Sequence, residues 1–190
     1  TTGAVQLGGT INEVGFDLTN SNLSGATGTG TMFTATAVNN SADTGEINLL
    51  SNGWATLAGD VTTSGNAFIQ ATSGNIVQTA GTLRAADAVL TALGGSIGSA
   101  GGAIATNVQT LGMDSQGSAY AVNSGALNLG AMTTSNGTVN VTTQNGPLTV
   151  TSINVTPSIG GNAIGLMQNG VSANGSGNVV LQANGGDLNL

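Results

Sequence analysis

The chain has 190 residues, with 8 acidic side chains against 1 basic one and a formal net charge of −7. A single Arg and no Lys leave no cationic stripe to neutralise phosphates, so binding to nucleic acid is excluded and anionic lipid surfaces are disfavoured. The absence of His and Cys excludes thiolate and Ser-His-Asp catalysis and the common zinc sites, and no cofactor or metal is expected.

The composition favours an elongated stack over a compact globule. Hydrophobic residues make up 39 % of the chain, but only 3 % is aromatic, so most apolar side chains are small. No apolar run is long enough to cross a bilayer as a helix, and no membrane insertion is expected. The chain opens with Thr1 and lacks a signal peptide, so we expect residues 1–190 to be a single segment of a longer chain.

A degenerate repeat runs along the chain: a short apolar strand, a turn that ends in glycine, then a second short strand. Apolar residues alternate at period two within the strand pieces, as in Ile47 and Leu49, which is typical of β-structure. In chain order the copies are INLLSNGWA (47–55), FIQATSGNI (68–76), VLTALGGSI (89–97), LGMDSQGSA (111–119), VNVTTQNGPL (139–148), IGLMQNGVS (164–172) and VLQANGGDL (180–188).

The turn glycines define a period near that of the shortest solenoid repeats. We predict structural corner turns at Gly53, Gly74, Gly95, Gly117, Gly146, Gly170 and Gly186, with Asn52, Asn145 and Asn169 just before three of them. The interval is regular as far as Gly117, then longer up to Gly146, and shortest between the last two glycines. Gly9 and Gly30 extend the series upstream, which predicts about nine coils of roughly 21 residues.

Asn and Gly tolerate positive φ, which we expect the corners to require, so Gly95→Val should be strongly destabilising. The long interval from Gly117 to Gly146 predicts an extra strand or a bulged loop within residues 118–137, which include Tyr120, and the short last interval predicts a trimmed corner. One minority interpretation remains, a short helix over residues 82–93, because that stretch lacks Gly and Pro.

Strands this short are stable only when they stack in parallel on the coil below, with their backbones paired at about 4.8 Å and their inward side chains forming a narrow core. The predicted fold is therefore an all-β parallel β-solenoid, or β-helix. The residues expected to point inward are Ile47, Leu49, Ile69, Ile76, Leu90, Ile97, Val139, Val141, Leu148, Ile164, Leu166, Leu181 and Leu188.

The run SGNIVQTAGTLRAADAVLTALGGSIGSAGGAI (73–104) resembles the repeats of filamentous-haemagglutinin-like bacterial exoproteins, which include two-partner-secreted adhesins. At the level of a degenerate repeat, the resemblance extends from about Gly9 to Leu190. It implies a right-handed β-helix shaft, export across the outer membrane, and a role in adhesion, biofilm formation or toxin presentation. It supplies no catalytic or ligand-binding motif.

Few residues qualify as chemical sites. Aligned on the repeat, Asp114 and Asp187 fall at different places around the coil, which disfavours a catalytic carboxylate pair, and GGDLNL (185–190) matches a calcium-solenoid repeat only once. Arg84 and Asp87 are predicted to form a local surface ion pair. Trp54 is expected to cover the end of a strand, with contact to a sugar as the alternative.

The leading hypothesis is a structural, non-enzymatic shaft of an extracellular bacterial adhesin or filament, located at the cell surface. Its expected partner is a glycan or protein on a host or neighbouring cell. The alternatives are a solenoid subunit that self-associates end to end and a carbohydrate-active β-helix of the polysaccharide lyase, hydrolase or tail-spike type. Ice binding ranks below these, because the Thr-x-Thr pairs do not recur at the coil period.

Overall fold

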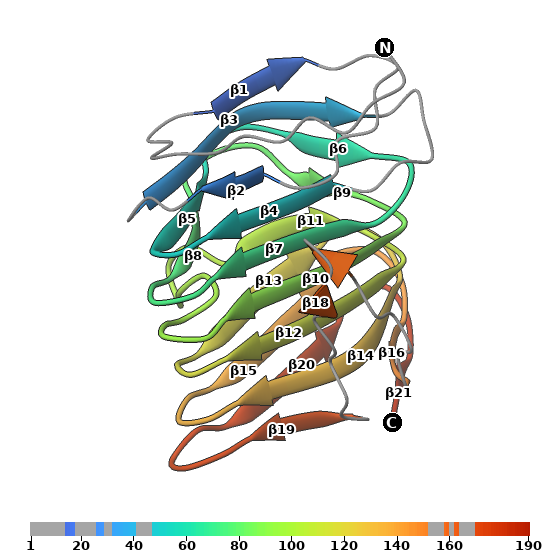
Figure 1. Cartoon of the computed structure of the whole chain (residues 1–190). Coiled ribbons are helices and arrows are strands. Elements are labelled where there is room, and N and C mark those ends of the chain that lie inside the picture. The colour runs from blue at the N-terminus through green and yellow to red at the C-terminus, as the bar shows by residue number, and fades with distance from the viewer. Residues whose placement is uncertain are drawn as a thin grey trace.

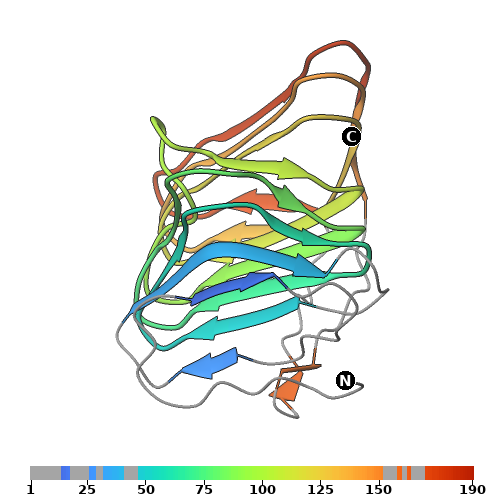
Figure 2. The same ribbon diagram turned by 90° about the horizontal axis from the view of Figure 1, so that it is seen from above.

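The chain winds into an all-β parallel β-solenoid (Figure 1). The computed structural model describes residues 14–17, 26–28, 32–40, 47–151, 158–159, 162–163 and 170–190, with side chains in 47–49, 51–151 and 170–190. No helix occurs among these residues, and the unbroken stretch 47–151 makes about five turns. Figure 2 shows the same stack from above.

Two parallel sheets form the walls of the solenoid, and the strands that pair within each sheet come from neighbouring coils. The first sheet, here called sheet A, has nine strands: β2 (Ala26–Gly28), β4 (Ile47–Ser51), β7 (Ala67–Ala71), β10 (Asp87–Ala92), β12 (Thr110–Ser115), β14 (Leu127–Thr134), β16 (Leu148–Val150), β19 (Val171–Ala173) and β21 (Leu188–Asn189).

The second sheet, here called sheet B, has ten strands: β1 (Val14–Asp17), β3 (Met32–Asn40), β5 (Trp54–Leu57), β6 (Val61–Thr63), β8 (Ile76–Gln78), β9 (Leu83–Arg84), β11 (Ile104–Asn107), β13 (Ala119–Asn123), β15 (Val139–Thr143) and β20 (Val179–Ala183). A separate antiparallel pair joins β17 (Ser158–Ile159) to β18 (Asn162–Ala163).

The narrow core lies between the sheets and follows the predicted alternation. Nine of the thirteen residues predicted to point inward are at most 1 % exposed: Ile47, Leu49, Ile69, Ile76, Leu90, Ile97, Val139, Val141 and Leu148. Leu181 packs against the core but is only partly buried, and Leu188 is 43 % exposed although it stacks on Leu148. Ile164 and Leu166 lie outside the described residues.

The minority interpretation of a helix over residues 82–93 is wrong. Leu83 and Arg84 form β9 in sheet B, and Asp87–Ala92 forms β10 in sheet A, with a corner between the two strands. The predicted ion pair between Arg84 and Asp87 is absent, because the two side chains belong to strands on different walls.

The irregularity expected over residues 118–137 is present, but it does not involve Tyr120. Ala119, Tyr120 and Ala121 lie in β13, which pairs in continuous register with β15. The sheet B side of this coil is regular, because Ile97 pairs with Ala119 and Ala119 pairs with Val139, each one regular period farther along the chain. The bulge lies in β14 of sheet A, where Leu129 pairs with Leu111 but Met132 pairs with Met113, so β14 has one residue more than β12 between these pairs.

A larger irregularity comes later in the chain. Val139 pairs directly with Val179, so this turn of the solenoid is nearly twice as long as the turns before it. Leu148–Val150 lies on one half of β14 and Val171–Ala173 on the other half, so the segment between them is inserted into a single strand position. The count of nine coils is therefore not confirmed, since it treats this segment as a coil of its own.

Candidate functional site

The predicted corner glycines belong to two different corners of the coil. Gly53, Gly74, Gly95 and Gly117 lie two residues before Ala55, Ile76, Ile97 and Ala119, which are in register with one another in sheet B. Gly146 and Gly186 lie two residues before Leu148 and Leu188, which are in register in sheet A. The uneven intervals after Gly117 arise from comparing glycines of different corners.

The first corner, where the chain passes from sheet A to sheet B, contains two glycines that sequence reasoning missed. The register Ala119–Val139–Val179 places Gly137 and Gly177 in line with Gly117. We call this set the glycine column: Gly53, Gly74, Gly95, Gly117, Gly137 and Gly177. Its signal in the sequence is Gly, one variable residue, then Ile, Val or Ala.

Close packing between coils, rather than backbone conformation, accounts for the glycine column. Gly74, Gly95, Gly117, Gly137 and Gly177 all lack a positive φ, which corrects the expectation for this corner. A Cβ on Gly95 would lie 2.6 Å from the carbonyl carbon of Gly74, and one on Gly137 would lie 2.5 Å from the amide nitrogen of Ser118. Real Cβ atoms do not approach so closely, so Gly95 and Gly137 cannot carry a side chain unless the coils move apart. At Gly74 and Gly117 the obstructing atoms belong to the side chains of Trp54 and Ser96.

Positive φ is found at the other corner, beside the inserted segment, and at the first corner only outside the glycine column, where Gly175 has φ 72°. Gly146 has φ 124° and Gly170 has φ 89°, whereas Gly186 lies outside this region and its neighbour Gly185 has φ 80°. Asn52 and Asn145 are exposed in their turns, and Asn169 lies outside the described residues.

A continuous row of side-chain hydrogen bonds runs beside the glycine column. The backbone N–H of Ser96 donates to Oδ1 of Asn75 at 2.7 Å, and that of Ser118 donates to Oγ of Ser96 at 3.0 Å. In the same way Thr138 donates to Ser118 at 3.0 Å and Asn178 to Thr138 at 3.4 Å. We call this set the polar ladder: Asn75, Ser96, Ser118, Thr138 and Asn178.

The polar ladder satisfies amide groups that the sheets do not reach. The backbone carbonyl of a ladder residue also accepts a hydrogen bond, from the amide of the first core residue in the preceding coil. The Ile76 amide, for example, donates to the Ser96 carbonyl at 2.9 Å. Trp54 occupies the position one coil before Asn75, where a further member of the polar ladder would lie. Its indole is 46 % exposed and covers Gly74, where an added Cβ would collide with the ring.

Buried hydroxyl groups close several of the turns. Ser51 donates to the carbonyl of Trp54 at 2.7 Å, Ser115 to Gly117 at 2.8 Å and Thr143 to Gly146 at 2.8 Å. Each of these side chains is the last inward residue of its strand and at most 2 % exposed. The same chemistry therefore occurs at both corners, which explains why their sequences look alike.

Asn123 occupies the equivalent strand end in β13 and makes five hydrogen bonds while fully buried. Its Oδ1 accepts from the Thr106 hydroxyl at 2.9 Å and from the Val108 amide at 3.0 Å. Its Nδ2 donates to the carbonyls of Val108, Gly125 and Ala126 at 3.0–3.2 Å. One side chain thus joins two coils and one turn, and sequence reasoning did not single it out.

The carboxylates that the structure describes do not form a catalytic pair. Asp87 stacks on Thr110, and Asp114 lies between Thr91 and Thr133 of the neighbouring strands. Asp60 accepts a hydrogen bond from the Thr82 amide at 2.8 Å. In the described part of the chain, no three acidic side chains gather where a metal ion could be held.

Asp114 differs from the other described carboxylates in its environment. Its side chain projects from the outer face of sheet A and is partly buried. Loss of solvent around the carboxyl raises the pKa of Asp114 above its ordinary value. The outer face of this wall is therefore less hydrated at Asp114 than an open sheet surface would be.

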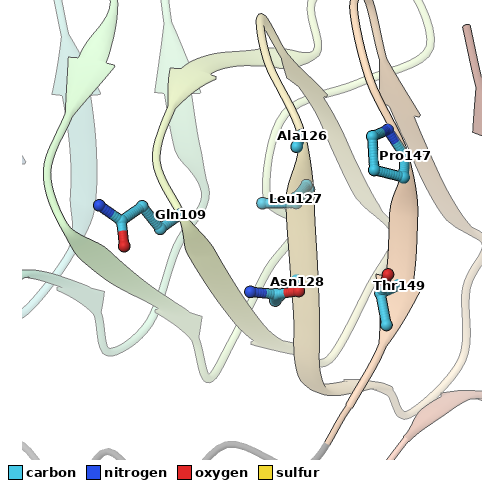
Figure 3. A pocket seen from close by; sticks show the side chains of 6 residues that line it. All are labelled: Gln109, Ala126, Leu127, Asn128, Pro147 and Thr149. Atoms are coloured by element: carbon cyan, nitrogen blue, oxygen red, sulfur yellow. The ribbon is translucent and has the colours of Figure 1, made fainter. Parts of the chain in front are cut away.

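A shallow hollow of about 220 Å³ lies farther along the outer face of sheet A. Gln109, Asn128 and Thr149 line it from three successive coils, together with Ala126, Leu127 and Pro147 (Figure 3). None of these side chains ionises, so the hollow offers hydrogen bonds and an apolar ring but no group for proton transfer.

Comparison with known proteins gives no match to a family model, a curated protein or a solved structure. Among the residues that the structure describes, no helix is suited to span a membrane.

Proposed function

We propose that this chain is a structural, non-enzymatic shaft segment of an extracellular bacterial surface protein of the adhesin type. The observation that carries the proposal is the continuous bonding from coil to coil, in which the polar ladder extends the hydrogen bonds of both sheets around the first corner. A wall bonded in this way resists bending and proteolysis, because no short strand opens without breaking contacts on two sides. The proposed winding is right-handed, as the resemblance of residues 73–104 implies.

The shaft proposal makes a prediction about rigidity that distance measurements can test. Asn52 and Ser176 are both exposed and lie at the first corner, five strand spacings apart, which is about 24 Å. The chain has no native cysteine, so spin labels can be attached at Asn52→Cys and Ser176→Cys alone. Electron paramagnetic resonance should give one narrow distance distribution near that value, and a broad distribution would refute a stiff shaft.

The partner we propose is a glycan or protein on a host or neighbouring cell. The neutral hollow at Asn128 supports this assignment, because amide and hydroxyl side chains beside a proline ring suit hydroxyl-rich ligands. Beads coated with the chain should adhere to target cells, and Asn128→Ala with Gln109→Ala should weaken adhesion. Exposed Gln116→Ala, at the opposite end of β12 from Gln109, is the control, and equal loss in both would contradict a role for the hollow.

A second candidate function is end-to-end self-association of the 190-residue chain. Val179 is 45 % exposed, whereas Val139, on which it stacks, is fully buried. Two sheet edges at this last coil have no strand above them in the described structure, and such edges pair readily with other strands.

Adjacent residues provide a matched test of self-association. Val179 stacks above the core, while Val180 stacks on Asn140 and points to the outer surface, with a similar exposure of 42 %. Val179→Lys should abolish any concentration-dependent assembly seen by analytical ultracentrifugation, and Val180→Lys should leave it intact. A wild-type chain that stays monomeric at all concentrations would remove this candidate.

A further inference from the structure

A row of side chains on the outer face of sheet A is buried although it points away from the core. Asn48, Phe68 and Val89 stack on one another in β4, β7 and β10, between the inward-pointing positions of those strands. They are 2 %, 1 % and 2 % exposed, and Phe68 is the largest fully buried side chain described. Phe68 and Val89 do not belong to the hydrophobic cluster between the sheets, so another part of the molecule covers them.

The buried surface extends sideways to Thr91, which is 3 % exposed. We call Asn48, Phe68, Val89 and Thr91 the outer patch. Two of its polar atoms, Oδ1 of Asn48 and Oγ1 of Thr91, are buried without a hydrogen-bond partner. The raised pKa of Asp114, one strand beyond Thr91, fits a cover that also excludes water there. The outer patch thus has both an apolar centre and polar groups that face its cover.

The inserted segment between β16 and β19 starts and ends on the same wall as the outer patch. Val150 lies beside Leu129 of β14, and Val171 lies beside Met132 of the same strand. The segment therefore leaves sheet A and returns to it almost at the same place. Within it, β17 and β18 form a short antiparallel hairpin.

The length of the segment suits the position of the outer patch. Val89 and Phe68 lie three and four strands along the sheet from β16, or about 14 and 19 Å at the usual spacing. Twenty residues separate Val150 from Val171, and half of them, fully extended, span about 33 Å. In Figure 1 the hairpin is drawn in front of β10 and β12, and in Figure 2 it lies outside the stack of coils.

We propose that the β17–β18 hairpin packs on the outer patch and is the cover of Phe68 and Val89. The burial of Phe68 and Val89 within a single chain requires a cover from the chain itself, and the hairpin is tethered at both ends to the same sheet and lies within reach of them. The outer wall of the shaft thereby gains a third layer over β4, β7 and β10.

Removal of the segment should leave the solenoid in register. Two residues, Gly130 and Ala131, separate Leu129 from Met132 in β14. Deletion of residues 152–169 leaves two residues, Thr151 and Gly170, between Val150 and Val171. The number of residues between Met132 and Val171 then equals the number between Leu127 and Leu148. These two form a strand pair one regular turn of the solenoid apart.

Thiol labelling can test the proposal directly, because the chain has no cysteine of its own. Phe68→Cys reports on the outer patch, and Asn128→Cys reports on an exposed position of the same face. In the full chain, Phe68→Cys should react with a thiol reagent at least about tenfold more slowly than Asn128→Cys. In the deletion variant, the two rates should become similar, while circular dichroism still reports the β-solenoid.

Two results would overturn the proposal: equal labelling rates in the full chain, or continued protection of Phe68→Cys in a folded deletion variant. Limited proteolysis decides the matter if the deletion variant does not fold. Phe68→Ser in the full chain should speed cleavage between residues 151 and 170 by about tenfold or more if the hairpin packs on Phe68. Val77→Ser on sheet B is the control, and equal cleavage in both variants would contradict the proposal.

Discussion

Glycine is required in the first corner because the backbone of one coil touches the backbone of the next. Gly95 and Gly125 provide a matched comparison, since neither has a positive φ. A Cβ at Gly95 would meet the carbonyl group of Gly74 at 2.6 Å, whereas a Cβ at Gly125 would meet nothing within 4 Å. The two positions therefore differ mainly in available space.

Gly95→Ala should lower the free energy of unfolding by about 2–4 kcal/mol, because the coils must separate to admit the methyl group. Gly95→Val should cost more. Gly125→Ala should be neutral or raise stability by up to about 1 kcal/mol, since it restricts only the unfolded chain. Urea denaturation of the variants measures these differences, and equal effects at the two positions would contradict the packing explanation.

Asn123 combines complete burial with complete hydrogen bonding. Asn123→Ala should destabilise the protein by about 3 kcal/mol or more, because the Val108 amide and three carbonyls lose their partner inside the fold. Asn128→Ala, at an exposed position, should change stability by less than about 0.5 kcal/mol. Thermal unfolding of both variants makes the comparison, and a small loss for Asn123→Ala would show that water replaces the amide.

The desolvated carboxyl of Asp114 predicts a pH dependence with a definite sign. Its pKa is raised in the folded protein, so folding favours the protonated form and stability falls as pH rises through the folded pKa. Asp114→Asn should therefore be more stable than the wild type at pH 7, and the difference should disappear at about pH 3, below the ordinary pKa of Asp. Asp187→Asn, which removes an equal charge from an exposed site, controls for net charge.

At the scale of the element, the repeating unit is a strand and the turn that follows it. Asn75, Ser118 and Thr138 play the same role in three different coils, because each has an oxygen that accepts the amide hydrogen of the ladder residue in the next coil. The identity of the residue matters less than the presence of a short side chain with an acceptor.

Ser118→Ala should therefore destabilise the protein by about 1–2 kcal/mol, since the amide of Thr138 loses its acceptor. Ser118→Thr should restore most of that stability, because Thr138 already performs this role one coil away. Chemical denaturation of the two variants provides the test. Failure of threonine to rescue would indicate that serine contributes through packing rather than through the hydrogen bond.

Much of the element structure follows from the sequence, but the assignment of corners does not. Period-two alternation located Ile47, Leu49, Val139 and Val141 in the core, and all four are buried. Both corners use hydroxyl side chains with Asn and Gly, so a local motif such as the one around Gly146 does not reveal which corner it forms. Only the pairing of distant strands separates them, and that pairing depends on the register of the whole stack.

The outward-facing positions were harder to predict for a related reason. Phe68 alternates with Ala67 and Ile69, as an exposed residue on the outer side of a wall would. Its burial depends on a contact outside the repeat, and no periodic pattern encodes such a contact. The polar ladder, by contrast, has a readable signal, because Asn, Ser or Thr follows the glycine column at five of its six positions.

At the scale of the whole molecule, each coil contacts mainly the coils directly above and below it, so stability is close to a sum over neighbours. Hydrogen exchange should therefore be slowest in β12 and β13, which have partners on both sides, and faster in β20 and β21 at the end of the stack. Mass spectrometry of exchanged peptides measures this gradient. Uniform protection along the chain would indicate a cooperative globule instead of a stack.

The interruption between β16 and β19 shows that this wall tolerates a long detour in the middle of a strand, provided that the chain resumes opposite Met132. A bonded scaffold with such a gap can carry foreign sequence at that point without losing its own alignment. The junction of Val150 and Val171 is thus a natural graft site, where an epitope or enzyme could be displayed on the flank of the solenoid.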